Sequence, residues 1–331
     1  MGMYKVVIIA TALAVVAACS RATEPTPAAA NALDAVIAAD AAVEKIAGGY
    51  KFLEGPLWRP SSGTLWFSDL VGNVVYEWST DGKTREILNP GGYDGKDAPP
   101  GAYIGPNGMV MGPDGAVLLT QHGNRRIARV TPDGQVNTLV DRFEGKRLNS
   151  PNDLVYTPDG ALYFTDPPFG LPKANDDPGK EQPFNGVYRL SGGTLQVVVR
   201  DIALPNGIAF SPDYKTLYVA NSEANRRLWM RYDVNADGSV SNGRVFADAT
   251  SSKDEGVPDG LKVDSTGNVY AAGPGGVWVF SAAGTLLGTI KTPETPSNCA
   301  WGDDGRTLYI TAVTGLYKVR TKIPGMKAVY N

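Results

Sequence analysis

The sequence of 331 residues has little of what many catalytic sites are built from. It contains one histidine, His122, and two cysteines, Cys19 and Cys299. A single histidine excludes a zinc site with several histidine ligands. Neither a Gly-x-Ser-x-Gly elbow nor a glycine-rich phosphate loop with a lysine occurs, so a serine hydrolase of that type and a P-loop are not indicated. The formal net charge of −3, without a run of Lys or Arg, gives no electrostatic reason to expect nucleic acid as a partner.

The N-terminal residues 1–19 have the features of an export signal. Lys5 precedes an apolar run, residues 6–18, that is too short for a comfortable membrane span. The run ends in Val16-Ala17-Ala18-Cys19, which resembles a bacterial lipobox, in which the cysteine becomes the lipidated N-terminus. The alternative is an ordinary cleaved secretory signal with an incidental cysteine. We therefore expect an exported, periplasmic protein anchored to the membrane by a lipid on Cys19, with Cys299 as its remaining cysteine and no intramolecular disulfide.

Residues 20–41 are rich in Ala, Pro and Thr and predict a tether, although residues 28–47 could also hold a helix. From residue 42 to residue 331 the pattern is that of short strands separated by Gly, Pro and Asp turns. The six clearest strands are expected at residues 64–68, 116–120, 161–165, 216–220, 268–272 and 307–311. The whole chain has 39 glycines and 24 prolines, and this turn-rich pattern of short strands predicts an all-β domain.

A short phrase recurs six times, each time just before one of these strands. Its key position is held by an oxygen-bearing side chain in every copy, and successive copies lie about 40 to 55 residues apart. That spacing suits one four-stranded propeller blade per repeat, so we predict a six-bladed β-propeller. The key residues, which would ring the central axis as a place for a hard metal ion, are Glu54, Asn107, Asn152, Asn206, Asp259 and Ser297.

The hairpin that follows each phrase fixes which residues share one end of the propeller. If the phrase starts the first strand, a tight turn returns the second strand to the same end. His122 and Asp166, just past two of the second strands, are therefore expected at the same mouth as the key ring. The long segments 89–104 and 167–184 should also overhang this opening, as lids or binding walls.

These phrases together resemble the gluconolactonase and regucalcin family, also called SMP-30. The resemblance rests on Glu-Gly-Pro at Glu54, Ser-Pro-Asn-Asp-Leu at Ser150, Leu-Pro-Asn-Gly-Ile-Ala-Phe-Ser-Pro-Asp at Leu204 and Pro-Asp-Gly-Leu at Pro258. It covers residues 48–317, and Gln-His-Gly-Asn-Arg-Arg at Gln121 is similar to the bacterial gluconolactonase branch. The resemblance implies a six-bladed propeller with one divalent cation in a central pocket. It also implies that the protein hydrolyses lactone esters.

Carried over residue by residue, the resemblance implies a metal site made of four of the key residues, Glu54, Asn152, Asn206 and Asp259. The same set looks like the catalytic-metal set of the diisopropyl-fluorophosphatase propeller. Two carboxylates and two amides suit a hard cation, so Ca²⁺ is expected, with Mg²⁺, Mn²⁺ or oxygen-bound Zn²⁺ as alternatives. The remaining key residues, Asn107 and Ser297, are assigned to the pocket wall, Asn107 as the better substrate contact.

The expected reaction is hydrolysis of a sugar lactone by carbonyl polarisation and attack of water, a carboxylic-ester hydrolase activity. The family favours Asp259 as the general base, whereas His122 is the competitor, either as the base or as a substrate contact. Asp166 is a further expected substrate contact, and Arg125 could bind substrate or be a surface ion-pair partner. The alternatives to a sugar lactonase are hydrolysis of organophosphates or aryl esters on the same metal and a non-catalytic ligand-binding propeller. We expect a small lactone as the substrate, no membrane contact apart from the lipid anchor, and a monomer or weak dimer.

Overall fold

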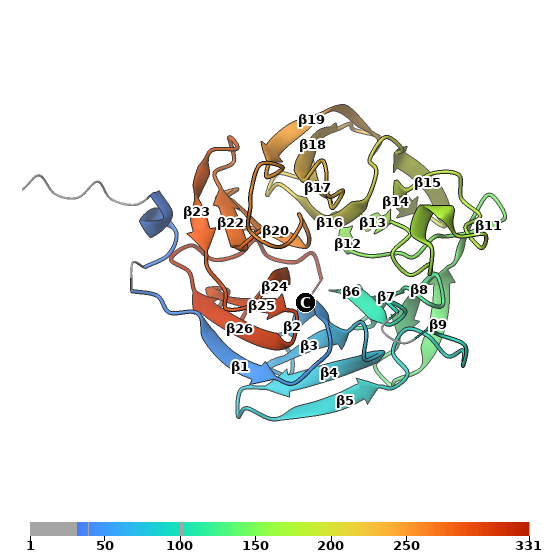
Figure 1. Cartoon of the computed structure of the whole chain (residues 1–331), viewed down its shortest axis with the longest axis horizontal. Coiled ribbons are helices and arrows are strands. Elements are labelled where there is room, and N and C mark those ends of the chain that lie inside the picture. The colour runs from blue at the N-terminus through green and yellow to red at the C-terminus, as the bar shows by residue number, and fades with distance from the viewer. Residues whose placement is uncertain (1–31, 39, 100–101, 331) are drawn as a thin grey trace, which may run out of the picture. The chain divides into compact units, whose positions relative to one another are not determined.

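The computed structural model describes residues 32–38, 40–99 and 102–330. They form six antiparallel four-stranded sheets arranged around a central axis (Figure 1), which confirms the predicted six-bladed β-propeller. The predicted signal 1–19, with Cys19, lies outside the described residues. No helix within the described ranges has the length and apolar character needed to span a membrane.

Blades 1 to 3 occupy the first half of the domain. Blade 1 comprises β2 (Leu53–Arg59), β3 (Thr64–Asp69), β4 (Val74–Ser79) and β5 (Thr84–Leu88). Blade 2 comprises β6 (Pro106–Met111), β7 (Val117–Gln121), β8 (Arg126–Val130) and β9 (Val136–Val140). A small hairpin, β10 (Arg142–Phe143) and β11 (Lys146–Arg147), precedes blade 3. Blade 3 comprises β12 (Leu154–Tyr156), β13 (Leu162–Asp166), β14 (Gly186–Ser191) and β15 (Thr194–Val199), with the 3₁₀ helix η2 (Ala174–Asp176) in its long loop.

Blades 4 to 6 complete the ring. Blade 4 comprises β16 (Pro205–Phe210), β17 (Thr216–Asn221), β18 (Leu228–Val234) and β19 (Val240–Asp248). Blade 5 comprises β20 (Leu261–Val263), β21 (Val269–Gly273), β22 (Gly276–Phe280) and β23 (Leu286–Ile290). Blade 6 comprises β24 (Pro296–Gly302), β25 (Thr307–Ala312), β26 (Gly315–Arg320) and β1 (Glu44–Gly48), in the order β1-β26-β25-β24.

The ring is closed by the pairing of β1 with β26. The N-terminal strand is the outermost strand of the last blade, antiparallel to β26, with Lys45 opposite Tyr317. This pairing satisfies the edge of β26 and ties the first strand of the domain to the last blade. The chain before it also packs on the propeller: η1 (Ala32–Ala35) leads to Val36 and Ile37, which are buried in the core between blades 5 and 6. The predicted tether 20–41 therefore ends in a segment that packs on the domain.

The six predicted strands correspond to β3, β7, β13, β17, β21 and β25, and each ends one residue later than expected, while β7, β13 and β21 also begin one residue later. Four polar residues expected just beyond these strands are instead their last residues, Asp69, Gln121, Asp166 and Asn221. Apolar side chains of adjacent blades pack between the sheets in six clusters, so the core is distributed around the ring and the axis is left to polar side chains.

The C-terminal residues cross the end of the propeller where the innermost strands finish. Gly325 pairs with Asp264, Met326 N–H donates to the carbonyl of Val263, and the Tyr330 ring packs against Tyr156. The C-terminal end of the chain lies near the axis in Figure 1. Because β20 and β12 end at Val263 and Tyr156, the tail covers the end of the axis opposite the recurring phrases.

Candidate metal centre

In every blade the regular strand pairing is interrupted at the key residue or begins only after it. In blades 1, 2, 4 and 6 the pairing of the first two strands is interrupted at the phrase, as between Glu54 and Leu57 or between Pro205 and Ile208. In blades 3 and 5 the first strand begins only after the phrase, at Leu154 and Leu261. Bulges of this kind turn a side chain out of the alternation of the strand, and they are common beside active sites.

Small residues next to the key positions make this approach possible. The residue after the key position is glycine in blades 1, 2, 4 and 5. A Cβ at Gly55 would lie 2.0 Å from the carbonyl oxygen of Asn107, and a Cβ at Gly207 would lie 2.3 Å from that of Asp259. The backbones of neighbouring blades therefore meet at the axis at distances that only glycine allows.

Hydroxyl groups fasten the phrases of neighbouring blades to one another. Ser68 Oγ donates to the carbonyl of Asn107 at 2.7 Å, and Thr120 Oγ1 donates to that of Asn152 at 2.7 Å. Thr165 Oγ1 donates to the carbonyl of Asn206 at 2.7 Å. Each bond joins a second strand to the key residue of the next blade, so the backbone of the ring is fixed by bonds that span the blades.

Ser297 belongs to this bracing. Its Oγ donates to the carbonyl of Leu53 at 2.6 Å and lies 2.9 Å from Thr311 Oγ1. The hydroxyl thus joins blade 6 to blade 1. The expected role of Ser297 as a substrate contact stays a prediction. Its hydroxyl is already hydrogen-bonded within the ring.

Glu54 and Asp259 form a pair of carboxylates at the axis, Glu54 buried at 3 % exposure and Asp259 partly buried. Burial raises the pKa of Glu54 to about 7, with the charge of Asp153 acting in the same direction. Burial also raises the pKa of Asp259 well above its ordinary value, and the charges of Glu54 and Asp153 raise it further. Buried acids that raise one another's pKa carry a desolvation and repulsion cost unless a cation or a proton compensates them.

The amides of the predicted set offer oxygen to the same place. Ser222 Oγ–H donates to the carbonyl of Pro258 at 2.6 Å, so its oxygen must accept the 2.9 Å bond from Asn206 Nδ2. Within the described residues Asn206 Oδ1 therefore remains as an acceptor. The side chain of Asn152 is buried as well, at 3 % exposure.

The chemistry of these donors fits a hard divalent cation. Asp259 Oδ1 is buried and has no hydrogen-bond partner in the described ranges. Two carboxylates and two amide oxygens match the oxygen ligands that Ca²⁺ or Mg²⁺ takes. No group of three or more His, Cys, Asp or Glu among the described residues is placed to hold a metal, so the set depends on its amides as well as its acids.

Three residues of this centre were not predicted. Asn298 Nδ2 donates to Glu54 Oε2 at 3.2 Å and lies 3.5 Å from Asp153 Oδ2, and Lys262 Nζ lies 3.6 Å from the same Asp153 oxygen. Lys262 supplies a positive charge that partly offsets the buried acids. Asp153 and Asn298 were detectable in the sequence, because they stand at the position where the other four phrases have glycine.

His122 and Asn107 lie together at the mouth. Asn107 Nδ2 lies 3.2 Å from His122 Nε2, and His122 Nδ1 lies 3.2 Å from the carbonyl oxygen of Tyr103. Both side chains are buried, and Asn107 Oδ1 has no partner in the described ranges. Burial lowers the pKa of His122 to about 4, against the opposing effect of the Tyr103 carbonyl.

Arg125 and Asp166 hold the loops of the mouth. Arg125 is 6 % exposed and donates from Nε to the carbonyl of Leu148 at 2.7 Å and from Nη1 to that of Gly179 at 2.7 Å. It is therefore a buried residue and not a surface ion-pair partner. The two oxygens of Asp166 accept the amides of Asn149 and Ser150, at 2.8 and 2.9 Å. The expected substrate contacts of Arg125 and Asp166 stay predictions. Both side chains already form hydrogen bonds that brace the loop between blades 2 and 3 and the insertion after β13.

The two long loops meet at this mouth, as their places in the hairpins predicted. They line one pocket of about 260 Å³, with Pro99, Ala102 and Tyr103 from the first loop and Phe169 to Pro172 from the second. Gly170 lies directly over His122, since a Cβ there would be 2.8 Å from His122 Cβ.

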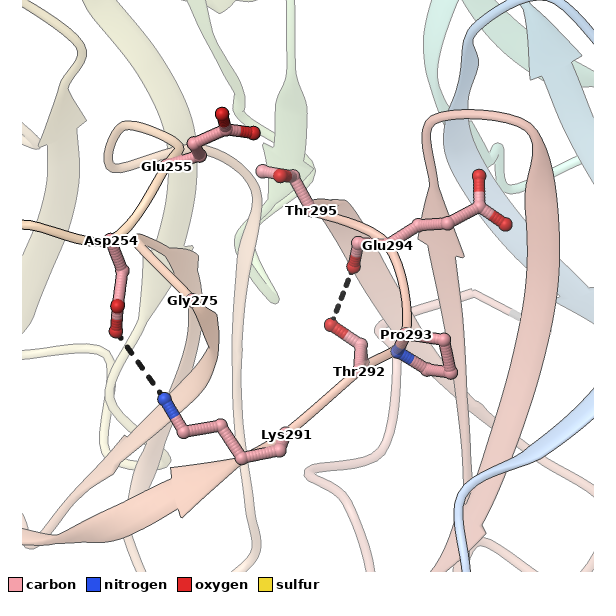
Figure 2. A pocket seen from close by; sticks show the side chains of 8 residues that line it. All are labelled: Asp254, Glu255, Gly275, Lys291, Thr292, Pro293, Glu294 and Thr295. Atoms are coloured by element: carbon pink, nitrogen blue, oxygen red, sulfur yellow. Dashed lines mark hydrogen bonds and ion pairs between the residues drawn. The ribbon is translucent and has the colours of Figure 1, made fainter.

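A second pocket of about 250 Å³ lies between the loop after β19 and the loop after β23 (Figure 2). Lys291 Nζ pairs with Asp254 at 3.4 Å on one side of it. Glu294 accepts the backbone amide of Thr314 at 2.7 Å and pairs with Lys45 of β1 at 3.0 Å. The carboxylate of Glu294 thus anchors the closing strand, and this pocket is separate in its residues from the axial set.

Comparison with known proteins agrees with this architecture. The model of the SMP-30/gluconolactonase/LRE-like region matches residues 52–314. A gluconolactonase of Zymomonas mobilis is 38% identical over 304 residues, which cover 88% of this chain and 85% of that protein. A pentonolactonase of Haloferax volcanii is 29% identical over 79% of this chain and 81% of its own. Among solved structures, a gluconolactonase of Xanthomonas campestris aligns with a TM-score of 0.76 at 36% identity, covering 88% of this chain and 92% of that one. On these matches, the chain belongs to the SMP-30/gluconolactonase/LRE-like family.

Proposed function

We propose that the protein is a metal-dependent lactonase that hydrolyses sugar lactones. The observation that carries the proposal is the pair of carboxylates at the axis of the propeller, the buried Glu54 and the partly buried Asp259, close enough for the charge of Glu54 to raise the pKa of Asp259. A binding platform has no need to concentrate acids there, because each costs desolvation free energy without a cation. The similarity to proteins named gluconolactonase and pentonolactonase supports a lactone as the substrate.

Glu54, Asn152, Asn206 and Asp259 would hold the divalent cation, and Ca²⁺ is the ion we propose for this oxygen-only set. When bound, the cation supplies Lewis-acid polarisation of the lactone carbonyl. Asp259 accepts a proton from the attacking water while the oxygen of that water forms a bond to the carbonyl carbon. The bond to the ring oxygen then breaks, and the proton passes to that oxygen, so one water opens the lactone to a hydroxy acid.

The test of this function is a comparison of substrate classes. We expect the purified protein to hydrolyse D-glucono-δ-lactone with calcium present, and to lose this activity in excess chelator. Aryl acetates and organophosphate triesters, offered at the same concentration, are the alternatives for the same site, since a P=O or ester C=O responds to the same polarisation. A faster chelator-sensitive rate on either would replace the lactone as the substrate class, and binding of lactone without turnover would indicate a non-catalytic propeller.

We also propose that the protein is exported and anchored through Cys19, on the strength of the lipobox-like residues 16–19. Cys19→Ala should move the protein from the membrane to the soluble fraction of cells, with its lactonase activity unchanged. Wild-type protein found in the soluble fraction would indicate an ordinary cleaved signal.

A further inference from the structure

His122 lies where the two long loops meet blade 2. Its backbone amide donates to the carbonyl of Gly105 at 3.1 Å, at the end of the first loop, and Gly170 of the second loop packs on its Cβ. The side chain is 0 % exposed. Both ring nitrogens have a neighbour within hydrogen-bond distance, and these two neighbours determine which nitrogen carries the proton.

The Tyr103 contact fixes the tautomer. A carbonyl oxygen can only accept a hydrogen bond, so the ring nitrogen 3.2 Å from it, Nδ1, must carry hydrogen. A neutral imidazole has one N–H, and His122 Nε2 is then an acceptor. The atom 3.2 Å from Nε2 must therefore be a donor, which assigns it as the Nδ2 of the Asn107 amide.

This chain of bonds determines the orientation of Asn107. With Nδ2 held by His122, Oδ1 is the atom that has no partner among the described residues, and it is buried beside the axial ring. We propose that His122 is a positioning residue: the Tyr103 carbonyl holds it as the Nδ1–H tautomer, and its Nε2 turns the Asn107 amide so that Oδ1 is presented as an acceptor to a hydroxyl of the substrate. The orientation follows from the bonds alone, whereas the hydroxyl rests on the proposed lactonase function.

Two consequences follow for the reaction. His122 Nε2 is occupied by an Asn107 N–H, so this nitrogen is not available to take a proton from water. A buried acceptor such as Asn107 Oδ1 favours ligands that bring a hydrogen-bond donor. A lactone without hydroxyl groups is disfavoured, because Oδ1 stays unpaired in its complex. The site is therefore built for hydroxylated lactones, and an unsubstituted lactone such as δ-valerolactone should gain nothing from Asn107.

The orientation is tested directly on the unmodified mature protein by long-range ¹H–¹⁵N NMR, because the chain has a single histidine. The expected spectrum is that of a neutral Nδ1–H ring from pH 8 down to pH 5. An Nε2–H ring, or protonation near the ordinary histidine pKa of about 6.5, would overturn the proposal.

Asn107→Asp removes the N–H donor, so His122 should then take up a second proton at a clearly higher pH. The same change at the exposed Asn137 of β9 is the control and should leave the titration as it was. An unchanged titration in Asn107→Asp would equally contradict the assignment.

A pair of amide substitutions separates positioning from packing. In His122→Gln the side-chain oxygen can take the place of Nε2, whereas in His122→Asn the amide reaches only the position of Nδ1. His122→Asn should raise KM for D-glucono-δ-lactone about tenfold with kcat within about twofold, and His122→Gln should restore most of that loss. With δ-valerolactone the two variants should have equal KM. A loss of kcat that is equal in both variants would mean that His122 acts in the chemical step. Should neither lactone be turned over even by the wild type, the proposed function fails while the NMR result still decides the orientation.

Discussion

Replacing Asp259 by asparagine is expected to lower kcat for D-glucono-δ-lactone by about a hundredfold or more at saturating calcium. A positioned general base contributes about 10²- to 10⁴-fold to a rate, and asparagine keeps the shape of the side chain without the ability to accept the proton. Asp259 Oδ1 is buried and unpartnered in the described part of the chain, which leaves an oxygen free for this role.

The matched control for this substitution is Asp254→Asn. Asp254 lines the second pocket, lies five positions before Asp259 in the sequence, and is paired with Lys291. Its replacement should leave kcat within about twofold. Circular dichroism, thermal melting and metal content must show that both variants are folded and loaded. If the loaded Asp259→Asn protein keeps kcat within tenfold of the wild type while His122→Ala abolishes it, the general base is His122 and not Asp259.

Removal of the cation should make the protein less stable as the pH rises. The pKa of Glu54 is raised in the folded state to about 7, above its ordinary value of 4.5, and that of Asp259 is raised in the same direction. The folded state therefore binds more protons than the unfolded state between these values, and the free energy of unfolding falls as pH rises through that window. One pKa unit corresponds to about 1.4 kcal/mol, so the loss is on the order of 3 kcal/mol between pH 5 and pH 8.

In excess chelator we accordingly expect Tm to fall by roughly 5 °C or more from pH 5 to pH 8. Calcium favours the ionised acids, so it should raise Tm at pH 8 and have much less effect at pH 5. Glu54→Gln removes one of the two titrating acids. In excess chelator the Tm of this variant should therefore change less with pH than the Tm of the wild type. A wild-type Tm that rises over this range in chelator, or one that calcium leaves unchanged at pH 8, would contradict the assignment of a cation to these acids.

The repeated phrase was enough to predict the number of blades and the blade to which each phrase belongs, because one pattern of turn and strand recurs six times. It also placed His122 at the mouth, from the direction of a hairpin alone. The sequence could not show that β1 would close blade 6, since strand pairing over that distance depends on the geometry of the finished ring.

Hydrogen bonding was the other feature hidden from the sequence. Arg125, Asp166 and Ser297 are polar residues near a predicted pocket, and the residue type does not reveal that the backbone uses their polar atoms. Their partners, such as Gly179 and Leu53, are distant in the sequence and come close only through the packing of neighbouring blades. Lys262 was missed for the same reason, because its charge matters only where it reaches Asp153 of another blade.

Calorimetric titration of calcium into the chelator-treated protein decides whether the axial acids bind a catalytic cation. We expect one ion per chain for the wild type, and no measurable binding for the double variant Glu54→Gln/Asp259→Asn. The control variant Asp254→Asn/Glu255→Gln removes as many negative charges from the second pocket and should bind calcium as the wild type does. The axial metal site is contradicted if the wild type takes up no ion at millimolar calcium, or if the axial double variant binds with unchanged affinity.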